Sequence, residues 1–324
     1  MPKETKYVLI IGSSNMDLNI YSKRFPNPGE TVTGGTFKQF LGGKGANQAV
    51  ASVRSGSTTY FIGKIGTDNF GNQMISQLSK EGIDISHVIR DNENASGVAF
   101  ILIDENGENM ISVAPGSNFN LSIEEIKTKE AVIKNAHVLV VQMEIPIKTI
   151  ERVIKIASKG NVVKILNPAP LKPIPIDILK KLDIIIPNRG ELFQLYSFLN
   201  PDEELQGKGE SEIIKASKRL VQLGIKTVIT TLGDKGCLIY FGSEDKVVEI
   251  PSPKVNAVDT VGAGDCFIGA LASRINQGEH IVEAVKFATI AASIAVKRKG
   301  AQDSMPFLNE IEENLENSKK NGDI

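Results

Sequence analysis

The sequence predicts an α/β fold built on a mainly parallel sheet, and two observations support this prediction. Short apolar runs that end at glycine, asparagine or proline alternate with longer amphipathic segments, as in repeated strand and helix units. The chain has 324 residues, of which 41% are hydrophobic, so it is long enough to bury a large core. Together these features favour a sheet covered by helices on its faces.

The individual elements follow from the length and spacing of the apolar residues. The expected strands are residues 8–11, 138–142, 162–166, 183–186 and 227–231. The expected helices are residues 47–54, 70–81, 147–158, 212–223 and the alanine-rich stretch 266–294. Each strand ends where turn-forming residues begin, so the loops after the strands are candidates for a binding site.

Two β-rich segments interrupt this alternation, at residues 31–41 and 97–113. The second contains Asn106-Gly107, a strong hairpin signal because both residues tolerate positive φ. We expect these segments, with bounds of about 18–41 and 95–115, to form a small sheet that covers an edge of the core. At the other end of the chain, residues 310–324 are polar and charged, so we expect the last residues of this tail to fray or remain disordered.

Charge and composition limit the classes of partner. Lys and Arg number 37 against 38 for Asp and Glu, so a net charge of -1 gives no reason to expect binding to nucleic acid or to a membrane surface. The two cysteines lie far apart in the chain, which indicates a reducing compartment. The apolar run after polar residues 1–6 is too short for a signal peptide. We therefore expect a cytoplasmic protein.

The most informative segment is the glycine-rich turn of residues 259–267, which leads into an apolar helix. Backbone N–H groups at a helix start attract anions, and glycine allows a phosphate to approach the backbone. Gly262, Ala263 and Gly264 are therefore candidate phosphate-binding residues, and Asp265 is a candidate base beside them. A lone Asp at this position would more often only cap the helix, but the two preceding glycines favour the functional interpretation.

A second glycine cluster, residues 42–46, also leads into a helix and carries Gly43, Lys44 and Asn47 within reach of a polar ligand. It lacks the spacing of a Walker A loop, and it also suits a tight helix entry. A third cluster lies between two expected strands, where it is either an ordinary turn or the edge of a nucleotide site. Its residues are Thr231, Leu232, Gly233, Asp234, Lys235 and Gly236.

Polar residues also follow several expected strands. Asn15 and Asp17 come after the first strand and Glu144 after residues 138–142, where they could bond to vicinal hydroxyl groups or simply form turns. Asn188 and Glu191 have the spacing of a capping box.

Five of these segments occur in the order found in one known family. They are Asn15-Met16-Asp17, Gly42-Gly43-Lys44-Gly45-Ala46-Asn47, Asn167-Pro168-Ala169-Pro170, residues 188–191 and Gly262-Ala263-Gly264-Asp265. With these motifs the chain resembles the ribokinase-like, or PfkB, carbohydrate kinases over roughly residues 7–308. Gly300-Ala301-Gln302 followed by Ser304 resembles the ribokinase branch. The resemblance implies one domain over residues 1–324, a three-layer α/β/α sandwich with a small β-sheet lid, and a homodimer formed through the lids.

The resemblance also implies a role for each candidate residue. The sugar would contact Asn15, Asp17, Gly43, Lys44, Asn47, Glu144 and Asp265. The nucleotide would contact Asn188, Thr231, Leu232, Gly233, Asp234, Lys235, Gly236, Gly264 and Thr289, although Thr289 stands where a larger polar group is expected beside adenine. A monovalent cation, normally K⁺, would be held by Asp259, Val261, Ala295, Arg298, Gly300 and Ser304. Glu191 would act indirectly on Mg²⁺. The Lys and Arg residues before Gly300 also suit a helix C-terminus.

The implied activity is transfer of phosphate from ATP to the 5-hydroxyl of D-ribose, giving D-ribose 5-phosphate and ADP with Mg²⁺ and K⁺ as cofactors. Such a transfer needs alignment and charge stabilisation more than covalent help, so Gly262, Ala263, Gly264 and Asp265 are the expected catalytic residues. Other acceptors remain open, namely 2-deoxyribose, fructose, a nucleoside or a keto-deoxy sugar acid. A sugar-binding protein without turnover is the alternative from another class.

Overall fold

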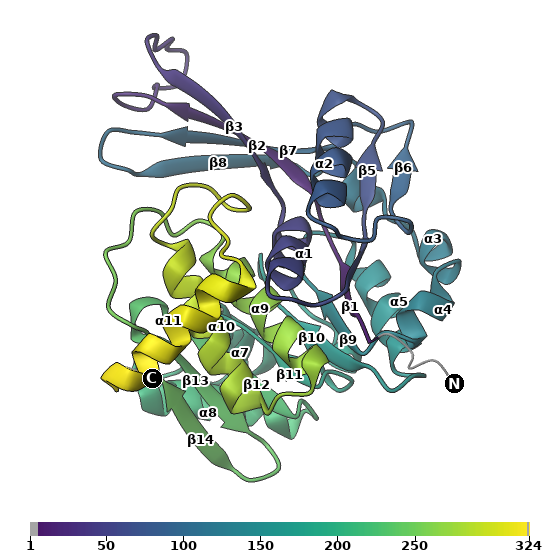
Figure 1. The fold of residues 1–324 in the computed structure, drawn as a ribbon, viewed down its shortest axis with the longest axis vertical. Coiled ribbons are helices and arrows are strands. Elements are labelled where there is room, and N and C mark those ends of the chain that lie inside the picture. The colour runs from purple at the N-terminus through teal and green to yellow at the C-terminus, as the bar shows by residue number, and fades with distance from the viewer. Residues whose placement is uncertain (1–5, 323) are drawn as a thin grey trace.

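A computed structural model describes residues 6–322 and residue 324, and its largest element is an eight-stranded sheet (Figure 1). The strands follow the order β14-β13-β12-β11-β10-β9-β1-β4. They are β1 (Val8–Ile11), β4 (Thr59–Ile62), β9 (Val138–Val141), β10 (Val163–Leu166), β11 (Ile184–Ile185), β12 (Thr227–Thr231), β13 (Cys237–Phe241) and β14 (Lys246–Ile250). Strands β4 to β12 pair in parallel, and β13 and β14 pair antiparallel at one edge. This confirms the predicted mainly parallel sheet and all five expected strands.

Both faces of the large sheet are buried, as the nearly continuous apolar strands predict. Side chains alternate between the faces, so Val8 and Ile10 of β1 enter one hydrophobic cluster while Leu9 and Ile11 enter the other. All four are fully buried. The sheet is therefore the middle layer of three.

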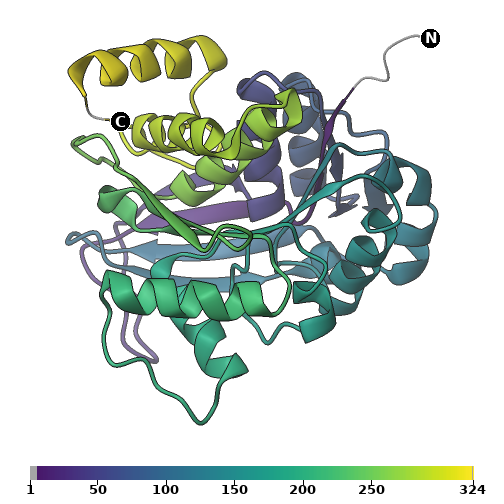
Figure 2. The ribbon, with the colours of Figure 1, turned by 90° about the horizontal axis from the view of Figure 1, so that it is seen from below.

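Helices form the two outer layers, which Figure 2 shows on opposite sides of the sheet. The first cluster includes residues of α1 (Lys44–Arg54), α2 (Asn69–Lys80), α9 (Ala263–Gln277), α10 (Ile281–Ala295) and α11 (Leu308–Asn321). The second includes residues of α3 (Ile123–Lys127), α4 (Glu130–Lys134), α5 (Ile147–Ala157), α6 (Ile176–Leu179), α7 (Arg189–Leu199) and α8 (Glu210–Gln222). The predicted α/β/α sandwich is confirmed.

A second sheet of four strands projects from the sandwich (Figure 1). Its order is β3-β2-β7-β8, with β2 (Asn15–Tyr21), β3 (Thr36–Gly42), β7 (Gly97–Ile103) and β8 (Asn109–Ala114). The hairpin predicted at Asn106-Gly107 joins β7 to β8, and Gly107 has a φ of 81°. Because β2 begins only four residues after β1 ends, the chain passes directly from the large sheet into the small one. A short parallel pair, β5 (Lys64–Gly66) with β6 (Ile89–Asp91), forms a separate two-stranded sheet.

One sequence expectation was wrong in detail. The alanine-rich stretch 266–294 is not one helix, because α9 ends at a left-handed Gly278 with a φ of 88° and α10 starts anew at Ile281. The polar C-terminal segment contains a helix that the sequence did not predict, α11, which ends at Asn321, and the expected fraying of its last residues stays a prediction. This helix buries Ile311 against the core, so a single apolar stripe suffices to dock a helix of otherwise polar composition.

Some predictions fall on residues that the structure leaves undescribed. Residues 1–5, on which the inference about a signal peptide partly rests, and residue 323 of the C-terminal tail lie outside the described part of the chain. Within that described part, no helix combines the length and the apolar character needed to cross a bilayer.

Candidate active site

The glycine-rich turn at residues 259–267 forms the start of α9. Gly262 is the N-cap in the left-handed conformation, with a φ of 76°, which a residue with a side chain rarely adopts. Asp265 lies in the first helical turn and is 7% exposed. A Cβ added to Gly264 would have no described atom within 4 Å beyond its own neighbours, so the backbone there faces open space. A phosphate could approach the N–H groups of this turn without obstruction.

Helix α1 packs against α9 and brings two amides to Asp265. Asn47 Nδ2 donates to Asp265 Oδ2 at 2.9 Å, and Gln48 Nε2 donates to Asp265 Oδ1 at 2.9 Å. The close approach of the helices depends on Gly269, because a Cβ there would lie 2.3 Å from the carbonyl oxygen of Gln48. Both carboxylate oxygens of Asp265 are therefore held by residues 218 and 217 positions away in the chain.

The start of α1 is fixed by Glu144, which follows β9. Glu144 Oε2 accepts hydrogen bonds from Ser13 Oγ at 2.5 Å and from the Lys44 backbone N–H at 3.1 Å. Gly43, the N-cap of α1, has a φ of 87° and provides no side-chain cap, so Glu144 supplies the missing acceptor from another element. This contact joins β1, β9 and α1 where the two sheets meet.

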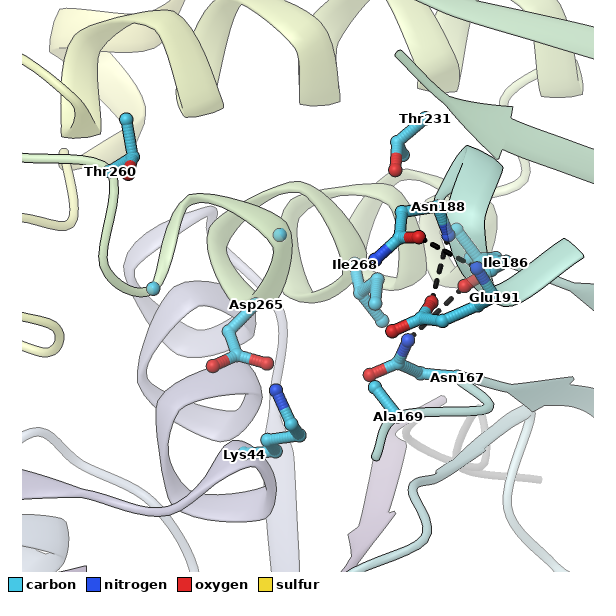
Figure 3. A pocket seen from close by; sticks show the side chains of 12 residues that line it. Lys44, Asn167, Ala169, Ile186, Asn188, Glu191, Thr231, Thr260, Asp265 and Ile268 are labelled. Atoms are coloured by element: carbon cyan, nitrogen blue, oxygen red, sulfur yellow. Dashed lines mark hydrogen bonds between the residues drawn. The ribbon is translucent and has the colours of Figure 1, made fainter. Parts of the chain in front are cut away.

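One cavity of about 220 Å³ opens at the carboxyl ends of the parallel strands (Figure 3). The carboxylate of Asp265 and the ammonium of Lys44 face each other on one side of it, and Asn188, Glu191 and Thr231 lie on the other. Strand ends and a helix start thus meet at one place, as is usual for ligand sites in open α/β sheets. Its lining residues are Lys44, Asn167, Ala169, Ile186, Asn188, Glu191, Thr231, Thr260, Gly262, Gly264, Asp265 and Ile268.

A second cavity of about 570 Å³ lies between the small sheet and the start of α9. Its lining includes Asn15, Asp17, Gly43, Asn47 and Glu144. Three residues, Lys44, Gly262 and Asp265, line both cavities. Asp265 therefore stands at the boundary between the cavity under the small sheet and the cavity at the strand ends.

The electrostatic environment of the site is dominated by carboxylates around one lysine. Burial, followed by the negative charges of Glu144 and Asp265, raises the pKa of Asp17 to about 7. The pKa of Lys44 lies above its usual range, chiefly because of the Asp265 carboxylate. Burial also raises the pKa of Glu191. The surroundings of Asp17 and Glu191 therefore disfavour the charged form of these two carboxyl groups.

The structure brings only some of the candidate nucleotide residues to the strand-end cavity, namely Asn188, Thr231 and Gly264. Asn188 caps α7 in a capping box with Glu191, as the spacing predicted, and it forms an isolated bridge with Thr231. The loop after Thr231 forms a short 3₁₀ helix at Gly233–Lys235 that leads to Gly236, whose φ is 88°. Asp234 is exposed in this loop.

Other candidate nucleotide residues point elsewhere. Leu232 and Lys235 border a different cavity, beside Arg189. Thr289 is 4% exposed, and its hydroxyl donates to the Val285 carbonyl of the same helix.

The residues suggested for a monovalent cation lie in two segments joined by Asp259. Its Oδ1 accepts from the Val261 N–H and its Oδ2 from the Gly300 N–H, each at 3.0 Å. The Ala295 carbonyl accepts from the Arg298 N–H at 3.0 Å, and the buried Ser304 hydroxyl donates to the Ala301 carbonyl. Among the described residues there is no cluster of three His, Cys, Asp or Glu side chains suited to a metal.

Sequence reasoning assigned no role to four polar residues at the site, which are Gln48, Asn118, Gln142 and Asn167. Asn167 lines the strand-end cavity, donates to the Ile186 carbonyl at 3.1 Å and accepts from Gln48 at 3.3 Å. Asn118 donates to Asn15 Oδ1 at 2.8 Å. Gln142 donates to Gln48 Oε1 at 2.6 Å. Asn167 and Gln142 both follow strands, so the strand-end rule could have found them, whereas Asn118 comes from a 3₁₀ helix with no such signal.

Comparison with known proteins agrees with this architecture. A family model described as pfkB family carbohydrate kinase matches residues 5–308. The chain belongs to this family of carbohydrate kinases.

Three relatives show how close the similarity is. A ribokinase of Staphylococcus aureus is 38% identical over 309 residues, which cover 95% of this chain and 99% of the relative. A deoxyribokinase of Salmonella typhi is 35% identical over 309 residues, covering 95% and 98%. The solved structure of Arabidopsis thaliana ribokinase complexed with ribose and ATP has a TM-score of 0.88 at 31% identity, covering 96% of this chain and 99% of that chain.

Proposed function

We propose that the protein transfers the terminal phosphate of ATP to the 5-hydroxyl of D-ribose, giving D-ribose 5-phosphate and ADP. The observation that carries this proposal is the position of Asp265 and Lys44 on the boundary of two cavities. Phosphoryl transfer requires that the acceptor hydroxyl meets the donor phosphate in line, with a base within reach of the hydroxyl proton. Similarity to ribokinases along nearly the whole chain supports ribose as the acceptor.

The sugar is assigned to the cavity under the small sheet. Asn15, Asp17, Asn47, Lys44 and Glu144 line it, and they offer both donors and acceptors to hydroxyl groups. The backbone of Gly43 lines the same cavity. Selectivity for a sugar arises because a buried polar group without a hydroxyl partner is costly.

ATP is assigned to the strand-end cavity, with its phosphates toward the N–H groups of Gly262, Ala263 and Gly264. In the reaction the 5-hydroxyl oxygen bonds to the γ-phosphorus and the bond from phosphorus to the oxygen of ADP breaks. The hydroxyl proton passes to the carboxylate of Asp265. The N–H groups at the start of α9 stabilise the negative charge that develops on the transferring phosphate.

The donor set of the strand-end cavity suits Mg²⁺, because this ion prefers oxygen ligands and is usually held through phosphates and few protein carboxylates. Glu191, the carboxylate of this cavity besides Asp265, would hold it indirectly. The ion would supply neutralisation of phosphate charge.

K⁺ is assigned to the segments that Asp259 joins. The Asp259 carboxylate, the carbonyl groups of Val261, Ala295, Arg298 and Gly300, and Ser304 are all oxygen donors of the kind that hard cations prefer. The fit is supported by the two hydrogen bonds that tie Asp259 to Val261 and Gly300. The bound ion would stabilise the turn that precedes α9.

The small sheet is assigned as a lid and as the contact between two copies of the chain in a homodimer. Phe37, Phe100 and Met110 in its strands are each more than half exposed. The strand register places these three side chains on the face turned away from the cavity under the small sheet, which Ile111 and Val113 line. A second copy packed on that face would cover the three side chains. Size-exclusion chromatography with light scattering tests this, since a monomer at micromolar concentration contradicts it. The cytoplasmic location stays a prediction.

A second acceptor, 2-deoxyribose, is supported by the 35% identity to a deoxyribokinase. Steady-state kinetics with ribose, 2-deoxyribose, fructose, a nucleoside and a keto-deoxy sugar acid separate these acceptors. The proposal expects the highest kcat/KM with ribose. A preference of tenfold or more, about 1.4 kcal/mol, for another acceptor would overturn the assignment to ribose. An absence of turnover with every acceptor would favour a binding protein instead.

A further inference from the structure

The two oxygens of Asp265 have partners that differ in their access to the ligand cavities. Asn47, which holds Oδ2, lines the cavity under the small sheet. Gln48, which holds Oδ1, is 0% exposed, and in the described structure it lines neither of the two cavities that meet at Asp265. A ligand in the cavity under the small sheet can therefore compete for the amide of Asn47, whereas the Gln48 amide lies out of reach of a ligand in either of these cavities.

The orientation of the Gln48 amide is determined by its three partners. Its nitrogen donates to Asp265 Oδ1 at 2.9 Å and to Asn167 Oδ1 at 3.3 Å, which uses both N–H bonds. Its oxygen accepts from Gln142 Nε2 at 2.6 Å. A flipped amide would place its oxygen against the Asp265 carboxylate and its nitrogen against the Gln142 nitrogen, so only one orientation satisfies all partners.

The supports of Gln48 come from the strand ends of the large sheet. Gln142 follows β9 and is 0% exposed, and it is packed so closely that a Cβ on Gly12 would lie 1.9 Å from its Oε1. Asn167 follows β10 and is itself anchored to the Ile186 carbonyl. The rigid sheet thus fixes the amide that holds Asp265.

We propose that Gln48 is a positioning residue, which holds Oδ1 of Asp265 and leaves Oδ2 as the oxygen that accepts the proton of the sugar hydroxyl. When the sugar binds, its hydroxyl takes the place of the Asn47 amide at Oδ2. The proton then moves to Oδ2 while the new bond to phosphorus forms and the bond to ADP breaks. This inference rests on the proposed kinase function.

The test is Gln48→Met, which keeps the length of the side chain but removes both hydrogen-bonding groups. With ribose and ATP, kcat is expected to fall about 10–100-fold, since a small misplacement of a catalytic group has an effect of this size. KM for both substrates should change less than about threefold, because Gln48 lines neither of the two cavities in the described structure. If this variant does not fold, Gln48→Asn, whose amide is shorter by one methylene, is measured in the same way and should show the same separation of kcat from KM.

A second measurement separates positioning from general damage to the fold. In an Asp265→Asn background, Gln48→Met should change the residual kcat by less than about twofold, because residues that act as a unit have non-additive effects. A kcat within twofold of the parent for Gln48→Met, or an equal loss in both backgrounds, would overturn the inference. Failure of the inference can be told apart from failure of the proposed function, because in the second case the parent itself would lack ribose-dependent ADP formation.

Discussion

Gly42 leaves room for the carboxylate of Asp17. The two residues lie on the paired strands β3 and β2, and a Cβ added to Gly42 would stand 2.2 Å from Asp17 Oδ2 and 2.6 Å from its Cγ. No pair of unbonded heavy atoms tolerates such a distance, so any side chain at position 42 must displace the carboxylate. The geometry of the cavity under the small sheet therefore depends on a residue that has no side chain of its own.

Gly42→Ala should weaken sugar binding and leave the binding of ATP nearly unchanged. We expect KM for ribose to rise by about tenfold or more, corresponding to about 1.4 kcal/mol, with KM for ATP nearly unchanged. Steady-state kinetics at saturating co-substrate measure both values. Gly207→Ala is the matched control, because a Cβ there has no described atom closer than 3.9 Å. An unchanged KM for ribose in Gly42→Ala would show that Asp17 does not contact the sugar.

Gly264→Ala should lower the activity without lowering the stability of the protein. The position is helical and the added methyl group would meet open space in the ligand-free protein, so the melting temperature should stay the same or rise, since Ala stabilises a helix by up to about 1 kcal/mol relative to Gly. The methyl group would, however, occupy the approach to the α9 N–H groups. We expect kcat/KM for ATP to fall at least about tenfold. Full activity would show that phosphate does not approach at Gly264.

Asp17→Asn should raise stability at alkaline pH. Since the pKa of Asp17 is raised from 3.8 to about 7, the folded state binds more protons than the unfolded state between these values. The Asp17 contribution therefore makes the parent less stable as pH increases from 4 to 7, and this destabilisation persists above pH 7. The variant should melt at least about 2 °C higher than the parent at pH 8, with the difference shrinking toward pH 4.

Thermal melts of both proteins across this pH range test the Asp17 prediction. The variant should also bind ribose less tightly, because it loses a charged acceptor. A difference in melting temperature that is constant with pH would show that the pKa of Asp17 is not raised in the folded protein.

Asp259→Asn should weaken the response to potassium. The substitution keeps one oxygen acceptor for the Val261 or Gly300 N–H but removes the negative charge that would attract the cation. We expect the K⁺ concentration for half-maximal activity to rise several-fold. Activity is measured against KCl with choline chloride holding the ionic strength constant. Identical activation curves for variant and parent would place the cation elsewhere.

Much of the fold could be predicted because its signals are local. The buried strands are short apolar runs, and the turn Asn106-Gly107 defines a hairpin by its own conformational preference. The break at Gly278 was missed since the apolar residues continue on both sides of it. The final helix was missed since its apolar stripe is narrow and its composition otherwise polar.

The site was predictable to the extent that its residues lie in glycine turns or after strands. Asp265, Lys44 and Asn47 come from such positions, and the structure brings them together. The partnership of Gln48 with Asp265 could not be predicted, because it depends on the packing of α1 against α9 across Gly269. Thr289 was selected by resemblance alone, and the structure buries its hydroxyl within α10.

The role of Asp265 is tested most directly by Asp265→Asn, which preserves the shape of the side chain but removes the base. With ribose and ATP we expect kcat to fall about 10³-fold, within the range typical of a lost general base. Ribose binding, measured by calorimetry, should remain, and the exposed Asp202→Asn should behave as the parent. A ribose-dependent rate of ADP formation within a few-fold of the parent would contradict the assignment of Asp265 as the base.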